Sequence, residues 1–270
     1  MSYTEIATQE DWDEYGRTRL AEIRKDPDKF IIDQRPSHRA AFEDISRIVG
    51  DVSGKNILDV GCGRGEFSIW LALQGANVSG LDIGPSLIEA AKAQAQVNGV
   101  SCDFRAGDIR RLPFKDEAFD FVLSIAVLHH LSEPDVITSL KECDRVLKRG
   151  GLFLAYEPVE DSKAFDFMQN VIPVGRPGDT EYRPSILMRK RWAEYLKERD
   201  DRPMTSCELI NAGTGVFNNA EMFHYGLFVR LVRIIGYGHK RWLYGFDRWL
   251  LYRLPFLKKI CQSVLIKYIK

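Results

Sequence analysis

The segment NILDVGCGRGEFSIWLA occupies residues 56–72. The apolar run 56–60 is typical of a buried strand, three alternate glycines follow it, and apolar residues then recur at helical spacing. The segment therefore predicts a strand, a tight turn and a helix. Glycine suits such a turn because a side chain would oppose a positive φ or hold the backbone away from a ligand above the helix N-terminus. We expect a nucleotide-like cofactor at this turn.

The spacing of the glycines narrows the class of cofactor. A dinucleotide-binding turn reads G-x-G-x-x-G, with its pyrophosphate at a helix N-terminus. Here the glycines are Gly61, Gly63 and Gly65, and Glu66 takes the third dinucleotide position. A carboxylate close to a diphosphate is electrostatically unfavourable. The turn thus favours a cofactor that has no phosphate and carries a cationic centre.

The same turn lies at the start of a block that alternates strands with helices. Strands are predicted at 77–83, 102–106, 120–124 and 152–156, and helices at 85–98 and from Ser132 to Leu147, where Gly150 and Gly151 end the helical pattern. Short connections between such elements are typical of a parallel, doubly wound α/β sheet.

The block resembles the class I S-adenosylmethionine-dependent methyltransferases. Their D-x-G-x-G-x-G turn is matched by residues 59–65, and further family segments follow in order at 107–114, 119–131 and 145–151. The resemblance implies a mostly parallel seven-stranded sheet and S-adenosyl-L-methionine as cofactor, with S-adenosyl-L-homocysteine as product. It covers residues 56–157 well and the last strand more loosely.

The resemblance also implies which residues contact the cofactor. Asp82 corresponds to the acid that holds the ribose hydroxyls, and a carboxylate can accept hydrogen bonds from both. Asp108 corresponds to the acid that meets the adenine amino group, and Ile109 to the apolar neighbour over the ring. The full predicted cofactor set is Asp59, Gly61, Cys62, Gly63, Asp82, Ile83, Asp108, Ile109 and Ser124.

For several of the predicted site residues the sequence allows both a functional and a structural role. Asp59 either ties down the glycine turn or lies near the methionine end of the cofactor. Cys62 is interpreted as a small residue that offers its backbone. The catalytic candidates are Glu157, His129 and His130, and each could orient or deprotonate an acceptor. The structural alternative for Glu157 is a hydrogen bond that tethers a loop. The structural alternative for a histidine is packing.

Four regions are predicted along the chain. Residues 1–50 form an N-terminal helical cap, 51–160 the cofactor-binding core, and 161–205 a helical lid inserted before the last two strands. Residues 206–270 complete the same domain with a helix at 206–212, a strand near 216–225 and a last strand at 263–269, placed at or next to a sheet edge.

The composition excludes several functional classes. The 270 residues carry 38 basic and 38 acidic side chains, so no overall field favours nucleic acid. The five cysteines are scattered without metal-ligand spacing, and we expect no metal site and no disulfide framework. With no secretory signal and no apolar stretch long enough to cross a bilayer, a cytoplasmic protein is expected.

The C-terminal segment departs from the neutral average. Residues 230–270 contain ten Lys and Arg against one acid, Asp247, and aromatic residues alternate with the cations over 240–259. Such a segment suits peripheral contact with an anionic membrane. The same aromatics at helical spacing could instead pack the segment onto the core while arginine stems cover its edge.

These observations predict a methyltransferase that acts on a small or medium-sized acceptor, with O-methylation of a glycan, a lipid-linked compound or an amphipathic metabolite favoured. The alternative is a cofactor-binding protein whose basic aromatic segment docks on a membrane or partner, with catalysis secondary. An NAD-dependent oxidoreductase is disfavoured by Glu66. The oligomeric state stays open.

Overall fold

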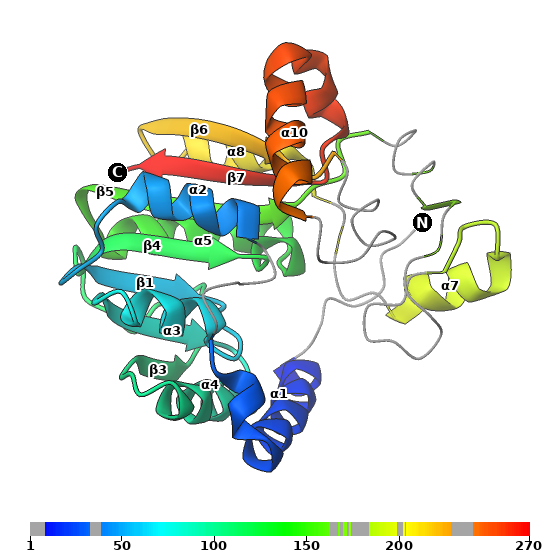
Figure 1. Cartoon of the computed structure of the whole chain (residues 1–270). Coiled ribbons are helices and arrows are strands. Elements are labelled where there is room, and N and C mark those ends of the chain that lie inside the picture. Colours follow the sequence, from blue (N-terminus) through cyan, green and yellow to red (C-terminus); the bar gives the residue numbers. More distant parts are fainter. Residues whose placement is uncertain are drawn as a thin grey trace.

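A seven-stranded sheet forms the centre of the computed structural model, which describes residues 9–32, 39–162, 167, 170–171, 173, 184–198, 202, 204–227 and 240–270 (Figure 1). The strands are β1 (Asn56–Val60), β2 (Asn77–Asp82), β3 (Asp103–Ala106), β4 (Phe119–Ile125), β5 (Leu147–Pro158), β6 (Asn219–Tyr225) and β7 (Ser263–Ile269).

The strand order is β3-β2-β1-β4-β5-β7-β6. β1 pairs in parallel with β2 and β4, and the parallel pairing continues to β3 on one side and β5 on the other. β7 runs antiparallel to both β5 and β6. This mixed, mostly parallel sheet confirms the predicted fold class, and β7 is the penultimate strand of the sheet.

Helices cover both faces of the sheet. The α-helices are α1 (Gln9–Lys25), α2 (Arg39–Val49), α3 (Glu66–Ala72), α4 (Pro85–Val97), α5 (Glu133–Val146), α7 (Arg189–Glu198), α8 (Ser206–Thr214) and α10 (Lys240–Arg253). Short 3-10 helices are η1 (Pro27–Phe30), η2 (Leu128–His130) and η4 (Pro255–Ile260). Of the predicted lid, 161–205, residues 163–166, 168–169, 172, 174–183, 199–201 and 203 lie outside the described residues.

The alternation of side chains along β1 divides the core into two layers. Ile57 packs in the layer under α2 and α3, whereas Leu58 and Val60 pack in the layer under α5 and α8. All three side chains are fully buried. A strand buried on both faces is apolar throughout except where it carries a functional or structural polar group, and in β1 the buried polar residue is Asp59.

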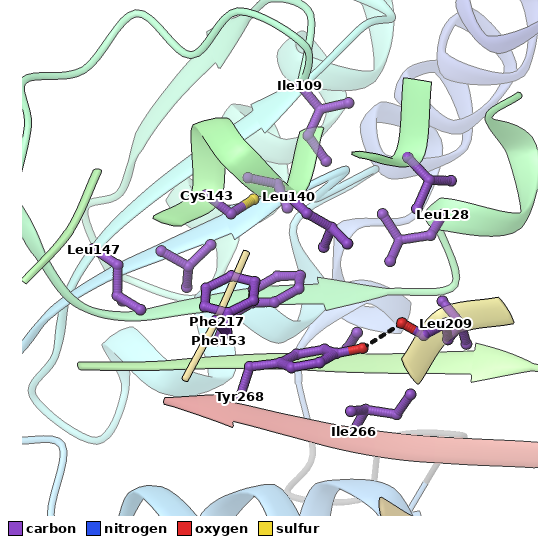
Figure 2. Close-up of a cluster of buried hydrophobic side chains, with 14 of the residues drawn as sticks. Ile109, Leu128, Leu140, Cys143, Leu147, Phe153, Leu209, Phe217, Ile266 and Tyr268 are labelled. Carbon is purple, nitrogen blue, oxygen red and sulfur yellow. Dashed lines mark hydrogen bonds between the residues drawn. The ribbon is translucent and has the colours of Figure 1, made fainter. Parts of the chain in front are cut away.

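The layer under α5 and α8 contains a stack of aromatic rings. Phe153 of β5, Phe217 and Tyr268 of β7 lie with their ring centroids 5.0 to 5.9 Å apart, and the Tyr268 hydroxyl donates a 2.6 Å hydrogen bond to the carbonyl of Leu209 (Figure 2). This bond satisfies a hydroxyl that would otherwise be buried without a partner. It also joins β7 to α8, so the antiparallel end of the sheet is firmly attached to the core.

Some predicted boundaries were wrong by a few residues. The helix before β5 ends at Val146, and β5 starts directly at Leu147 instead of residue 152. The reason is that Leu147 already pairs with Phe119, and the glycines at 150–151 lie where the register between the two strands shifts. β6 begins at Asn219 because α8 extends to Thr214.

Candidate functional site

The glycine turn joins β1 to α3 at the carboxyl end of the parallel strands. Gly61, Gly63 and Gly65 have φ values of 69°, 52° and 77°, which side-chain-bearing residues rarely adopt. The turn is attached to β2 because the N–H groups of Gly61 and Cys62 donate to the carbonyl of Leu81 at 2.7 and 3.0 Å.

Gly61 and Gly63 face different surroundings. A Cβ at Gly61 would lie 2.2 Å from the Val127 side chain, so this glycine allows close packing of two loops. A Cβ at Gly63 would meet no protein atom within 4 Å. The backbone at Gly63 is therefore exposed to open space above the helix N-terminus, where a ligand can approach it closely.

Asp82 connects the end of β2 to this turn. Its carboxylate accepts hydrogen bonds from the N–H of Gly63 at 2.8 Å and of Gly84 at 3.0 Å, and the residue is 8% exposed. Burial raises the pKa of Asp82, while these backbone donors act against that rise. A carboxylate has about four lone-pair sites, so capacity remains for a ligand diol.

A cavity of about 470 Å³ opens beside Gly63 and Asp82. Its volume falls within the range of small-molecule sites, and its walls come from the glycine turn, the ends of β2, β3 and β4, and the helix α1. The sequence-predicted residues that line it are Gly61, Gly63, Asp82, Ile83, Asp108, Ile109 and His130.

Two of the lining residues come from α1, which we expected only as a cap. Trp12 and Tyr15 border the cavity, and the Trp12 ring lies 5.0 Å from the ring of His130 in an edge-to-face contact. The helix is fixed to α4, because the Asp13 carboxylate accepts a 2.7 Å hydrogen bond from the N–H of Ser86. The apolar spacing of Trp12 and Tyr15 was visible in the sequence, but nothing local showed which surface they would cover.

The loop after β3 forms the opposite wall. Asp108 accepts hydrogen bonds from the Arg110 guanidinium at 2.6 to 3.0 Å, and this pairing lowers the pKa of Asp108. Arg110 also lies 3.3 Å from Asp135 at the start of α5. Asp108 and Asp135, the two partners of Arg110, both line the cavity, and so does Arg110 itself. The sequence did not predict Arg110 as a residue of the site.

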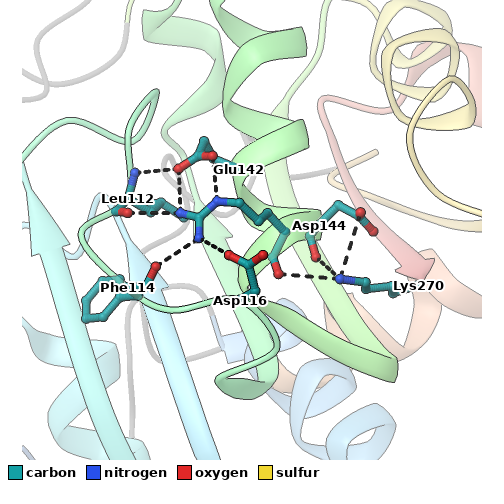
Figure 3. A network of polar contacts seen from close by, with 7 residues as sticks. Leu112, Phe114, Asp116, Glu142, Asp144 and Lys270 are labelled. Atoms are coloured by element: carbon teal, nitrogen blue, oxygen red, sulfur yellow. Dashed lines mark hydrogen bonds and ion pairs between the residues drawn. The ribbon is translucent and has the colours of Figure 1, made fainter.

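The far end of this loop is held by Arg145, in the last turn of α5. Its guanidinium donates to the carbonyls of Leu112 and Phe114 and pairs with Asp116 and Glu142 (Figure 3). An arginine that donates to two carbonyls and two carboxylates fixes a loop without regular structure. The position of the cavity wall therefore depends on the end of α5.

Glu157, near the end of β5, is fully buried and does not line the cavity. One carboxylate oxygen accepts from the N–H groups of Val127 and Leu128 at 3.0 and 2.9 Å, and the other accepts from Nδ1 of His129 at 2.7 Å. These hydrogen bonds tether a loop to Glu157 at residues 127–129, as in the structural alternative considered for this residue. The tethered loop includes Ala126, which has a φ of 58° that is strained for a residue with a side chain.

The remaining predicted cofactor residues lie behind the turn. Asp59 is 2% exposed and accepts a 2.6 Å hydrogen bond from the Ser68 hydroxyl of α3, and burial raises its pKa to about 7. Cys62 and Ser124 are also buried, and burial raises the pKa of the Cys62 thiol. None of these three side chains lines the cavity, so their predicted contact with a cofactor stays a prediction.

A second cavity, of about 540 Å³, lies between α2, β6 and α10. It is larger than the first, but none of the predicted cofactor residues lines it. Volume alone therefore does not select the site, because the predicted cofactor residues line the smaller cavity at the glycine turn. Within the described ranges, no group of three or more His, Cys, Asp or Glu residues is arranged to hold a metal ion.

Comparison with known proteins agrees with this geometry. Residues 58–155 match a family model described as a methyltransferase domain. These residues form a class I S-adenosylmethionine-dependent methyltransferase domain. The cofactor of the domain is S-adenosyl-L-methionine. The exposed backbone at Gly63 and the remaining acceptor capacity of Asp82 fit its amino-acid and ribose parts.

One relative of the methyltransferase domain is a ubiquinone biosynthesis O-methyltransferase of Coxiella burnetii. It is 32% identical over 151 residues, which are 53% of this chain and 63% of that protein. The chain thus spans less than two thirds of the length of this curated relative.

Solved structures share the fold of the methyltransferase domain and of the parts of the chain before and after it. An S-adenosylmethionine-dependent methyltransferase of Mesorhizobium loti superposes with a TM-score of 0.55 at 18% identity, covering 86% of this chain and 98% of that one. The cyclase SpnF superposes with a TM-score of 0.58 at 19% identity, covering 98% and 97%. The same fold therefore occurs in proteins named for different reactions.

Proposed function

We propose that the protein transfers a methyl group from S-adenosyl-L-methionine to a hydroxyl oxygen of a small amphipathic acceptor. The observation that carries this proposal is the cavity itself, which joins the predicted cofactor residues to a wall of Trp12, Tyr15 and His130. The O-methyltransferase named among the relatives supports oxygen as the acceptor atom.

The cofactor supplies a methyl group that is already activated by a sulfonium and leaves a neutral thioether. The chain then has to hold the acceptor in line with that methyl and keep water out. Trp12 and Tyr15 provide apolar surface for the acceptor on the α1 side of the cavity. Ile83 and Leu87 add apolar contact near the end of β2 and the start of α4.

His130 is the candidate general base in this proposal. When the acceptor oxygen takes the methyl group, an imidazole nitrogen of His130 would accept the proton that this oxygen loses. His130 lines the cavity, and its ring centroid lies 4.0 Å from that of His129, which Glu157 holds. Glu157 and His129 are then positioning residues for the loop that carries the base.

The test separates binding from transfer. Titration calorimetry with S-adenosyl-L-methionine, S-adenosyl-L-homocysteine and NADH measures the cofactor, and transfer of a labelled methyl to hydroxylated aromatic acceptors with and without an alkyl tail measures the reaction. We expect binding of the first two compounds and transfer that is faster to the tailed acceptors. Binding without transfer to any hydroxyl would contradict O-methylation, and binding of NADH alone would contradict the cofactor assignment.

A further inference from the structure

The C-terminal helix and the turn that follows it form a surface that the methyltransferase site does not use. We name it the aromatic-basic face and define it by the exposed side chains Phe246, Trp249, Tyr252, Arg253, Leu254, Phe256, Lys258 and Lys259. Five of the thirteen exposed large hydrophobic side chains of the described residues lie within 246–256. Such a concentration of exposed apolar side chains is typical of an interaction site, whereas single exposed apolar residues are common on any protein surface.

The aromatic side chains in the described part of α10 are exposed and do not pack on the core. The side that packs on the protein carries Asp247 and Leu251, four residues apart and 6% and 5% exposed. Trp249 and Tyr252 are 52% and 83% exposed and lie on the other side of the helix. The ring of Trp249 stacks on Phe246 at 5.8 Å, so the outward apolar surface is continuous. The side chains of residues 240–244 lie outside the described set.

The exposed charges on this face are all positive. Asp247 is the only acidic residue from 230 to 270, and it is buried. Arg248 lies 3.3 Å from the buried Asp44, so its charge is partly balanced within the fold. In contrast, Arg253, Lys258 and Lys259 are exposed, and no ion pair to another described residue involves them.

The aromatic-basic face lies at the same end of the sheet as the methyltransferase cavity. The turn η4 ends at Ile260, and Ser263 at the start of β7 pairs with Pro158 at the carboxyl end of β5. The glycine turn leaves the carboxyl end of β1, which is parallel to β5 through β4. Figure 1 shows α10 rising beside this end of the sheet.

We propose that the aromatic-basic face docks the protein on the surface of an anionic lipid bilayer. Trp and Tyr side chains with one polar end prefer the membrane interface, and Phe256 adds a purely apolar contact. The ammonium and guanidinium groups of Arg253, Lys258 and Lys259 then lie at the level of the lipid phosphates. An enzyme docked in this way holds its cavity end near the phase in which amphipathic compounds dissolve.

Two other occupants fit the face less well. A second copy of the chain would bring this positive face against itself in a two-fold contact, because such contacts use the same patch on both copies. The whole sequence is neutral and residues 230–270 carry ten cations and one acid, so the rest of the chain has more acidic than basic residues. That negative charge would repel nucleic acid.

The experiment is co-sedimentation of the full chain with vesicles, without cofactor or acceptor, so that its outcome is independent of the proposed methyl transfer. Vesicles of phosphatidylcholine alone are compared with vesicles containing 30 mol% phosphatidylglycerol, a composition on the order of that of anionic cell membranes. We expect binding to the anionic vesicles only, and weaker binding as the salt concentration rises.

Two variants locate the binding surface. The triple change Arg253→Gln, Lys258→Gln, Lys259→Gln is expected to weaken partitioning to anionic vesicles on the order of 100-fold. The double change Trp249→Ser, Phe256→Ser is expected to weaken it on the order of tenfold or more. Matched controls change exposed residues elsewhere: Lys92→Gln, Lys115→Gln, Lys141→Gln for charge, and Leu73→Ser, Ile137→Ser for apolar surface.

Thermal unfolding and S-adenosyl-L-methionine titration check that every variant remains folded. The proposal is overturned when the wild-type chain does not sediment with anionic vesicles, or when the charge control weakens binding as much as the triple variant. It is equally overturned when sedimentation velocity shows a dimer that the Trp249→Ser, Phe256→Ser variant dissociates while vesicle binding is absent, or when a nucleic acid duplex competes as an equal ligand.

Discussion

The carboxylate of Asp82 lies 2.8 Å from the backbone nitrogen of Gly63, in a hydrogen bond that joins the end of β2 to the turn after β1. Gly84 donates to the other oxygen of the same carboxylate at 3.0 Å. Hydrogen bonds within the protein therefore hold the turn in this shape. Binding then costs little ordering of the backbone, because the N–H groups and the carboxylate already occupy their positions.

The first prediction concerns Gly63 and uses Gly50 as its control. Both have positive φ, 52° and 65°, and a Cβ at either would meet no protein atom within 4 Å. Each change to alanine should therefore lower the free energy of unfolding by about 1 kcal/mol through backbone strain. Only Gly63→Ala places its methyl in the cofactor cavity, and it should weaken S-adenosyl-L-methionine binding by at least about tenfold in calorimetry.

The control gives this prediction its meaning. Gly50 closes α2 and does not line the cavity, so Gly50→Ala should leave the dissociation constant of the cofactor unchanged. Equal losses of affinity in the two variants would mean that strain, rather than the occupied space above Gly63, causes the effect.

The second prediction concerns the buried carboxyl of Asp59, whose pKa burial raises to about 7. The unfolded chain has an Asp pKa of about 4. Between these values the folded state keeps a proton that the unfolded state has lost, so the stability contributed by this group falls as the pH rises from about 4 to 7. The change Asp59→Asn removes the titration, while its amide oxygen can still accept the hydrogen bond from Ser68.

The measurement is urea unfolding of both proteins at pH 5 and pH 8. The stability of Asp59→Asn relative to the wild type should be greater at pH 8 than at pH 5 by about 2 kcal/mol. The variant Asp103→Asn, at an exposed position on β3, is the control for loss of one negative charge. A relative stability that is the same at both pH values would contradict the assignment of the titration to Asp59.

The strand, turn and helix at 56–72 were predictable because they depend on local features. Alternating glycines, an apolar run and helical spacing act within a few residues of one another. The parallel arrangement of the strands was predictable because strands alternate with helices along the sequence. The family segments then placed Asp82 and Asp108 at the edge where the cavity lies, and both line it.

Other parts of the site depend on contacts between residues far apart in the sequence. Gly16 and Leu87 are 71 positions apart in the sequence (87 − 16), and nothing near Gly16 shows that α1 would press against α4 there. The position of Glu157 at a strand end did not show which way its side chain turns. The hydrogen bonds to the loop at 127–129 decide that direction, and they exist only in the folded chain.

The third prediction tests the contact of α1 with α4. A Cβ at Gly16 would lie 2.3 Å from the backbone nitrogen of Leu87, so an added methyl forces the helices apart. Alanine has a higher helix propensity than glycine by about 1 kcal/mol, yet Gly16→Ala should destabilise the protein by about 1 to 3 kcal/mol. The exposed neighbour Thr18→Ala should be neutral or slightly stabilising.

Displacement of α1 also moves Trp12 away from the cavity. We therefore expect Gly16→Ala to raise the KM for the acceptor more than the dissociation constant of the cofactor. Chemical unfolding and steady-state kinetics at a temperature well below the melting point measure the two effects. A stabilised Gly16→Ala variant would show that helix propensity outweighs the clash and that the helices are not in tight contact.

The fourth prediction separates a tether from a base by comparing Glu157 with His130. Both oxygens of Glu157 are occupied by hydrogen bonds inside the protein, whereas His130 lines the cavity. The change Glu157→Gln keeps the shape but weakens bonds to a charged acceptor, so it should lower the free energy of unfolding by about 1 to 3 kcal/mol. Its kcat should stay within about tenfold of the wild type, because loss of a general base costs about 10²- to 10⁴-fold.

His130→Gln should give the opposite pattern. Its unfolding free energy should change by less than about 1 kcal/mol, because a partly exposed polar side chain is replaced by another. Its kcat for a hydroxyl acceptor should fall by at least about 100-fold, with cofactor affinity retained. If instead Glu157→Gln loses activity at unchanged stability while His130→Gln remains active, the proton is accepted by Glu157, and the loop over it has to open during the reaction.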